Sequence, residues 1–271
     1  MTRARAFALT LGAAAFCSGG CTPSLDPSQG YDAAAREIVL PYEPPALKVT
    51  EPPPLPPVAP RVVFHGPRDF KAIAMTFDAC STREPSLYDE RVTQVLVEKQ
   101  VPATIFLGGK WIEENLEHTR YLASLPRIEL GNHTFLHPHL TRVSDERLRQ
   151  ELAWTQAVLY TVTGRQATLF RAPYGEYDAR IVRAAAEAGL TTVQYDLAAG
   201  DPDVHATKER LVEYVVANAR PGSIIVMHIN RRGWHTAEAL PAIIDSLREK
   251  GFTFVTVGEW LARDSPTGRP P

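Results

Sequence analysis

The stretch Ala72-Ile73-Ala74-Met75-Thr76-Phe77-Asp78 is a short apolar run that ends on a carboxylate. It is the first of seven short runs rich in apolar and β-branched residues, at 72–77, 103–107, 127–130, 168–170, 191–196, 223–228 and 252–257. Short runs of this composition are typical of buried strands. The sequence therefore predicts seven strands, of which this stretch forms the first.

Helical patterns separate most of the runs, at residues 87–99, 115–124, 145–162, 178–188, 208–219 and 237–250. Ser144 and Thr207 stand where N-caps are expected, and Gly189 and Gly251 stand where helices should end. Strands that alternate with helices form parallel sheets. Seven such repeats favour a closed or nearly closed β/α barrel. A Rossmann fold is disfavoured, because the glycine-rich dinucleotide loop is missing.

The overall composition is that of a soluble globular protein. The chain has 271 residues, of which 44% are hydrophobic and 22% charged, and its formal net charge is -2. Neither the charge nor any basic or aromatic-basic stripe supports nucleic-acid binding. We therefore expect no nucleic-acid partner.

Residues 1–20 are expected to form a signal peptide. Arg3 and Arg5 precede an apolar stretch at 6–16, which is too short to span a membrane comfortably. The sequence Ser18-Gly19-Gly20-Cys21 then resembles a bacterial lipoprotein cleavage site, although Ser18 stands where leucine is usual. We expect an exported cell-envelope protein, lipidated at Cys21, or otherwise a periplasmic or secreted one. The alternative is a buried N-terminal helix.

Residues 21–60 are expected to form a proline-rich linker, with nine prolines between residues 41 and 60. Such a sequence favours an extended polyproline II spacer, and a disordered leader without a role is the alternative. The folded domain is expected at 61–263, followed by a flexible tail at 264–271. Because Cys80 is the only cysteine in this domain, we expect no internal disulfide.

Polar side chains follow five of the predicted strands. In a parallel β/α barrel the C-terminal strand ends meet on one rim, where catalytic residues lie. Two histidines four residues apart, in Gly131-Asn132-His133-Thr134-Phe135-Leu136-His137, can hold one metal ion. The rim is expected to carry Asp78, His133, His137, Arg171, Asp201 and His228.

These residues resemble a known family. The stretches Thr76-Phe77-Asp78, His133 to His137, Arg171-Ala172-Pro173-Tyr174, Asp201 and Val226-Met227-His228 are similar, in order, to the five motifs of the polysaccharide deacetylases. These are the enzymes of carbohydrate esterase family four, with the NodB homology domain. The similarity covers roughly residues 70–262. It implies a distorted barrel forming a single catalytic domain, and metal-dependent removal of acetyl groups from amino sugars.

The resemblance also assigns roles to individual residues. Asp78 would be the general base, and Arg171 would keep its carboxylate ionised and oriented. The Tyr174 backbone N–H would donate to the tetrahedral oxyanion. His228 would be the general acid, oriented by Asp201. Simpler readings are a strand-end cap for Asp78, a surface ion pair for Arg171, a core histidine for His228 and a turn former for Asp201.

The metal site departs from the family pattern at one position. The family has two adjacent carboxylates in its first motif, the second being a metal ligand, and here the second is Ala79. His133 and His137 would still hold a divalent ion, for which zinc is expected, but catalytic zinc sites usually have three protein ligands. The third ligand is left open between Asp78 itself, Cys80, Asp89 and additional waters.

The expected substrate is an N-acetylated polysaccharide: peptidoglycan, a chitin-like polymer or poly-N-acetylglucosamine. The membrane would be a partner only through a lipid anchor. Two other functions stay open. Ala79 is compatible with a catalytically impaired, glycan-binding homologue. The same chemistry would also serve an O-acetyl esterase or another metal-dependent amidase.

Overall fold

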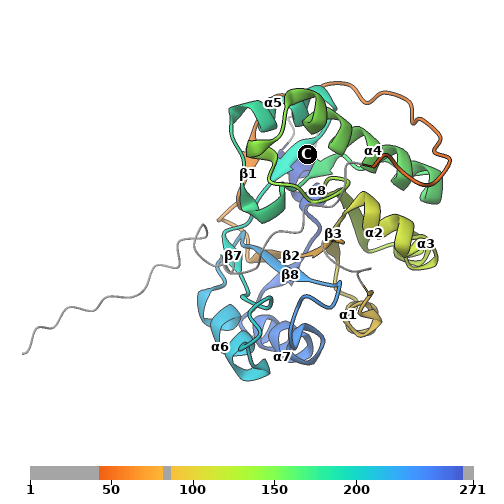
Figure 1. Ribbon diagram of the computed structural model, residues 1–271. Coiled ribbons are helices and arrows are strands. Elements are labelled where there is room, and N and C mark those ends of the chain that lie inside the picture. Colours follow the sequence, from red (N-terminus) through yellow and green to blue (C-terminus); the bar gives the residue numbers. More distant parts are fainter. Residues whose placement is uncertain (1–42, 82–86, 265–271) are drawn as a thin grey trace, which may run out of the picture.

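The computed structural model describes residues 43–81 and 87–264 (Figure 1). The expected signal peptide, Cys21 and nearly all of the expected tail lie outside these residues. Within them, no helix is long and apolar enough to cross a lipid bilayer.

The described residues form one sheet of parallel strands. Eight strands follow the order β1-β6-β5-β4-β3-β2-β8-β7, and β9 pairs with β2 outside this path. All seven expected runs contain a strand. The two additional strands, β1 and β7, have two residues each, which is too short to give a recognisable sequence pattern. The strands are β1 (Val62–Val63), β2 (Ala72–Ala79), β3 (Ala103–Leu107), β4 (Ile128–Asn132), β5 (Leu169–Phe170), β6 (Thr191–Val193), β7 (Leu197–Ala198), β8 (Ile224–His228) and β9 (Thr253–Phe254).

The helices match the expected pattern except at two places. The short helix α2 and the last helix α8 were not expected, and α8 begins inside the run at 252–257, where β9 ends early. Ser144 and Thr207 are N-caps, as predicted. The helices are α1 (Glu90–Glu98), α2 (Gly109–Glu114), α3 (Leu116–Ser124), α4 (Asp145–Thr163), α5 (Ala179–Glu187), α6 (Lys208–Asn218), α7 (Thr236–Glu249) and α8 (Val257–Asp264).

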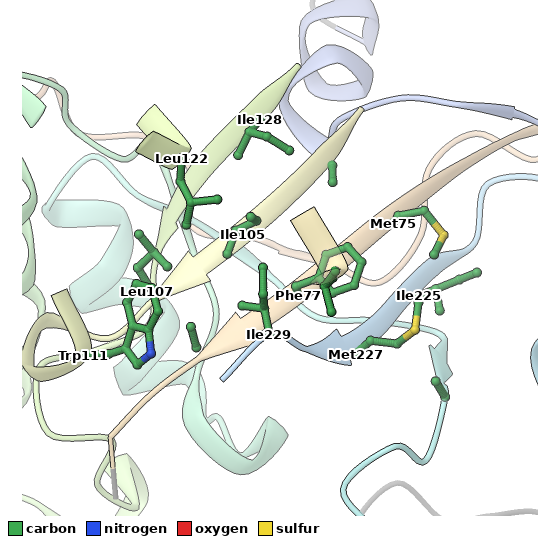
Figure 2. Packing of buried hydrophobic residues seen from close by; sticks show 14 of the residues in the cluster. Met75, Phe77, Ile105, Leu107, Trp111, Leu122, Ile128, Ile225, Met227 and Ile229 are labelled. Carbon is green, nitrogen blue, oxygen red and sulfur yellow. The ribbon is translucent and has the colours of Figure 1, made fainter. Parts of the chain in front are cut away.

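Strand alternation divides the core into an outer and an inner layer. Outward-facing side chains such as Met75 and Phe77 of β2 belong to one cluster with buried side chains of α1 to α7. Figure 2 shows part of this cluster, where Phe77 and its strand neighbours lie with Trp111 and Leu122. Inward-facing side chains such as Ala72 and Ala74 form a separate cluster that includes Trp260 of α8. Because successive strand residues face opposite sides, the next inward positions on β2 are Thr76 and Asp78. The inner face therefore carries both a small core and, above it, polar groups.

The sheet is curled into a half-barrel, and the segment after β1 bridges its gap. β1 pairs with β6, and His65 then forms an antiparallel bridge with Ser223, just before β8. Asp196 fastens the same corner, because its carboxylate binds Arg68 and the backbone N–H of Ile224. This arrangement confirms the α/β class and the distorted barrel, although no ladder between described residues joins β1 directly to β7.

Helix α8 covers the end of the barrel opposite the polar rim. Its first N–H groups donate to side chains near the starts of β3 and β4: Val257 N to Thr104 Oγ1 at 3.0 Å, and Gly258 N to Glu129 Oε2 at 3.0 Å. These bonds satisfy helix N–H groups that have no partner within the helix. The two bonds fix the start of α8 to this end of the barrel.

The described part of the proline-rich segment, residues 43–60, lies on the domain, and we call it the strap. Figure 1 shows it passing over α4 and α5. Leu47 N donates to Glu113 Oε1 at 2.9 Å, and Thr50 N donates to Thr161 Oγ1 at 2.8 Å. The side chain of Leu47 also packs against the outer core.

The second half of the strap is held in the same way. Val58 N donates to Ala186 O of α5 at 3.0 Å, and Pro53 O accepts from Gln166 Nε2 at 2.7 Å. The expected proline-rich linker is thus held to the domain over residues 43–60 by four hydrogen bonds, at Leu47, Thr50, Pro53 and Val58. A free tether would have to precede residue 43.

Gly189→Ala is expected to test the strap, because a Cβ at Gly189 would overlap the Cβ of Leu55 and lie 3.0 Å from Pro56 O. Gly164→Ala is the matched control, since both glycines follow a helix with positive φ but Gly164 faces open space. We expect Gly164→Ala to lower the free energy of unfolding by about 1 kcal/mol. Gly189→Ala should cost about 1–3 kcal/mol more. Equal costs in urea unfolding would show that the strap is not docked.

Candidate active site

Asp78 and His228 lie side by side on the rim. They are register partners on the adjacent parallel strands β2 and β8, near the C-terminal end of each. Both side chains are buried. Neighbouring parallel strands point register partners to the same face, so a carboxylate and an imidazole stand together on the inner face.

Arg171 holds the Asp78 carboxylate. Its Nη1 donates to Asp78 Oδ1 at 2.8 Å, although only 1% of the arginine side chain is exposed. The second amino group, Nη2, reaches Gln194 O at 3.3 Å, and the guanidinium lies over the Phe106 ring at 4.1 Å. This arginine is a fully buried ion-pair partner, which excludes the simpler reading of a surface ion pair.

The environment keeps Asp78 ionised. Burial by itself raises the pKa of its carboxyl, but the opposing effects, of which the charge of Arg171 is the largest, hold the pKa below the usual 3.8. The other oxygen, Oδ2, lies 3.8 Å from His133 Nε2. An ionised carboxylate with one oxygen directed away from its arginine can accept a proton.

Asp201 holds His228 in place. Its Oδ1 lies 3.1 Å from His228 Nδ1, and its Oδ2 accepts from the His228 backbone N–H at 2.7 Å and from Thr236 Oγ1 at 2.7 Å. Because the carboxylate occupies Nδ1, the second ring nitrogen, Nε2, is available for hydrogen bonding or proton transfer. Asp201 is fully buried, so it does more than form a turn.

His133 and His137 face one another in the loop after β4. Their ring centroids are 4.9 Å apart. His133 Nδ1 is 2.9 Å from Arg171 O, which directs Nε2 into the site. His137 Nδ1 is buried and has no hydrogen-bond partner among the described residues. Burial lowers the pKa of both histidines, that of His137 well below 6.5. Neutral imidazoles are the form that binds a metal.

The loop that carries these histidines is strained and is held by buried polar groups. Thr134 and His137 have φ of 65° and 57°, in the left-handed region that non-glycine residues rarely adopt. Glu151 Oε2 of α4 accepts from the N–H groups of Phe135 and Leu136 at 2.6 and 2.8 Å. Strain that surrounding contacts enforce is typical of functional sites.

Cys80 completes a set of three metal-binding side chains. Within the described residues, one group of histidine, cysteine or acidic ligand atoms lies close enough to hold an ion: those of Cys80, His133 and His137, all within 4.8 Å of one another. The set of two imidazoles and a thiol suits zinc. With the unpartnered His137 Nδ1, it fits the divalent ion that the sequence resemblance implies.

The structure places Asp89 outside this set. Its side chain caps α1 by accepting from Arg91 N, and its carboxylate also binds the Arg91 guanidinium at 2.7 Å. Arg91 in turn reaches Glu238 of α7. These contacts give Asp89 a helix-capping role and do not bring it to the two histidines.

Tyr174 stands over the site in the short turn Pro173–Gly175. Its φ is 59°, again left-handed. The ring stacks on His139 at 4.0 Å between centroids and meets His137 edge-on at 4.6 Å. The turn therefore stands directly beside the histidine loop.

Some residues that hold the site were not predicted to do so from the sequence. Glu151 lies in the middle of a helix, where an acidic residue is ordinary. Thr236 belongs to the stretch that resembles the family, but its contact with Asp201 could not be inferred from that resemblance. Asn230 and Arg232 follow β8 and approach the Cys80 sulfur, each at 3.7 Å. Only the three-dimensional arrangement shows what these four side chains contact.

Glu151→Ala is expected to leave two buried N–H groups without an acceptor and to lower the free energy of unfolding by about 2–6 kcal/mol. Because the loop positions His137, zinc affinity should fall by about 10–100-fold. Glu151→Gln keeps an oxygen acceptor, so it should recover much of the free energy of unfolding and much of the zinc affinity. Zinc titration and thermal unfolding measure the two effects, and an unchanged affinity in Glu151→Ala would contradict this positioning role.

Comparison with known proteins agrees with the geometry. The sequence profile of the polysaccharide deacetylase family matches residues 65–193. A peptidoglycan-N-acetylglucosamine deacetylase of Bacillus cereus is 30% identical over 203 residues, covering 74% of this chain and 92% of that protein. A chitooligosaccharide deacetylase of Azorhizobium caulinodans is 31% identical over 196 residues, covering 67% and 90%.

Solved structures show the same fold. A carbohydrate esterase family four pseudoenzyme from Bacillus anthracis superposes with a TM-score of 0.69 at 25% identity, covering 75% of this chain and 70% of that one. Sequence, fold and rim residues agree, so the chain belongs to the polysaccharide deacetylases of carbohydrate esterase family four, which are hydrolases of amide carbon–nitrogen bonds.

Proposed function

We propose that this protein is a metal-dependent deacetylase that removes N-acetyl groups from the amino sugars of a cell-envelope polysaccharide, with peptidoglycan as the first candidate and chitin-like or poly-N-acetylglucosamine polymers as the second. The observation that carries the proposal is the pairing of Asp78 with His228 on adjacent strands. Each is held by its own buried partner, beside two histidines. Relatives that act on peptidoglycan and on chitooligosaccharides support this class of substrate.

Hydrolysis of an acetamide requires a base that takes a proton from water. A divalent ion held by His133 and His137 would supply Lewis acidity, which polarises the carbonyl and makes water more acidic. Asp78 accepts the proton through the oxygen that Arg171 does not bind. The buried arginine keeps this carboxylate ionised and oriented.

The tetrahedral stage and the leaving amine need donors. The Tyr174 backbone N–H is the chain's own donor for the oxyanion. His228 gives a proton from Nε2 to the departing amine, and Asp201 at Nδ1 holds the ring in the orientation that this transfer needs. Acid and base are then separate groups, each with its own partner.

A second function is favoured by one specific observation. Ala79 stands where the family has a carboxylate ligand, and a pseudoenzyme is among the similar structures. A glycan-binding protein without turnover would keep the fold and bind polymer. Such a protein has no need for the buried Asp78–Arg171 and His228–Asp201 pairs.

The deciding experiment measures acetate release by the purified full chain, loaded with zinc. Peptidoglycan and chitin oligomers are the expected substrates, and O-acetylated xylan is the comparison. Release from N-acetylated polymers supports the proposal. Release from xylan alone would favour an O-acetyl esterase, and polymer binding without any release would favour the impaired homologue.

Arg171→Gln is expected to shift the acidic limb of the kcat/KM profile to higher pH. The arginine's charge lowers the pKa of Asp78, so its removal raises that pKa, and the base stays protonated up to a higher pH. Arg171→Lys keeps the charge and is the matched control, with a smaller shift expected. An acidic limb that is unchanged in Arg171→Gln would show that Asp78 does not limit the rate.

His228→Ala is expected to lower kcat by about 10²–10⁴-fold, because the amine loses its proton donor. Zinc content should stay at the wild-type level, which separates acid catalysis from metal binding. His205→Ala, in an exposed loop histidine, is the control and should turn over normally. Near-normal turnover in His228→Ala would remove it from the mechanism.

We also propose that the protein is exported and anchored in the cell envelope through a lipid on Cys21, supported by the apolar stretch and the Gly19-Gly20-Cys21 sequence. Cys21→Ser should move the protein from the membrane fraction to the soluble fraction. If wild type and variant both fractionate as soluble, ordinary signal cleavage replaces lipidation, and the active-site proposal is unaffected.

A further inference from the structure

We propose that the thiolate of Cys80 is the third protein ligand of the metal centre and replaces the carboxylate that is lost at Ala79. The inference rests on the metal-dependent function proposed above and specifies how this chain holds its ion.

The direction of the strand places Cys80, and not residue 79, toward the histidines. Ala79 packs in the outer core between the sheet and the helices. Asp78 and Cys80 have the opposite parity and face inward. A carboxylate lost at position 79 is thus offset by a sulfur one residue later on the inner face.

The backbone around Cys80 is fixed, so the sulfur position is defined. Ala79 O accepts from Gly108 N at 2.7 Å, and Cys80 O accepts from Asn230 Nδ2 at 2.7 Å. Only 2% of Cys80 is exposed. These hydrogen bonds tie the end of β2 to the segments after β3 and β8.

The three ligand atoms lie near the spacing that a zinc site needs. Tetrahedral zinc with one sulfur and two nitrogen ligands has ligand atoms about 3.3–3.6 Å apart. The thiol of Cys80 and the ring nitrogens of His133 and His137 are within 4.8 Å of one another. Shifts of about 1 Å in the sulfur and ring nitrogen positions, within reach of side-chain rotation, would bring the three atoms to the spacing of a tetrahedral zinc site.

Burial raises the pKa of the Cys80 thiol, but two hydrogen-bond donors approach the sulfur. The two polar atoms at 3.7 Å are both donors, Asn230 Nδ2 and Arg232 Nη1. A thiolate carries the same charge as the missing carboxylate, so the net charge of the centre is preserved. A sulfur ligand also favours zinc over ions that prefer oxygen, such as magnesium, calcium and manganese.

X-ray absorption at the zinc edge tests the assignment without relying on activity. The parent protein is the full chain with Cys17→Ser and Cys21→Ser, which leaves Cys80 as the only cysteine. We expect about one zinc per chain and one sulfur at about 2.3 Å. In the same background, Cys80→Ser should show only nitrogen and oxygen neighbours. Its zinc affinity should fall by more than about 100-fold, since even the loss of an outer hydrogen-bond partner costs 10–100-fold.

The outcomes separate this inference from the proposed function. Zinc bound by the parent protein with no sulfur neighbour would overturn the Cys80 assignment and leave the deacetylase proposal standing. A sulfur neighbour without acetate release would support the assignment and contradict the deacetylase proposal. A parent protein that binds no zinc would overturn both. The parent spectrum is decisive even if Cys80→Ser folds poorly.

Discussion

A charged guanidinium in the interior of the barrel is the constraint on which the site depends. Arg171 is almost completely buried, and its charge has to be compensated inside the protein. Removing one partner of such a pair typically costs about 3–5 kcal/mol. Asp78 compensates this charge, and the arginine's own carbonyl lies against His133 Nδ1. One residue at the end of β5 therefore positions both a carboxylate on β2 and an imidazole after β4. The ionisation of the proposed base and the orientation of a proposed metal ligand are consequently linked to the same buried residue.

The two faces of the sheet have different roles: the outer face forms the main core, and the inner face carries the polar site. The outer face packs Met75, Phe77 and their neighbours (Figure 2) in the larger of the two core clusters, together with side chains of α1 to α7. The inner face needs only a small cluster, capped by α8, and so leaves its upper part for polar groups. Polar side chains inside a protein require partners, and here these come in pairs: Asp78 with Arg171, and His228 with Asp201. Substitutions on the outer face should mainly change stability, and those on the inner face mainly chemistry.

Much of this arrangement could be predicted from the sequence, for physical reasons. Apolar runs followed by polar residues identify strands and their C-terminal ends, and parallel order brings those ends together, so the positions of Asp78, Arg171 and His228 followed from local pattern. Other features depend on distant contacts. The docking of the strap and the role of Glu151 have no local signature. The third metal ligand stayed open because the sequence alone does not show where β2 ends, and hence whether residue 79 or residue 80 faces inward. The strands β1 and β7 are too short to detect.

The docked strap also determines how the domain would bear a mechanical load. A pull on the chain ahead of residue 43 would first reach the hydrogen bonds of Leu47 and Thr50, and then that of Val58. These bonds join the strap to α2, α4 and α5 before the force arrives at β1, which contributes only two residues to the sheet. Tension on an anchored chain would be spread over three helices, and the barrel that carries the catalytic rim would be shielded from it. The prolines keep this segment extended. It would therefore lengthen little under tension and would transmit force directly.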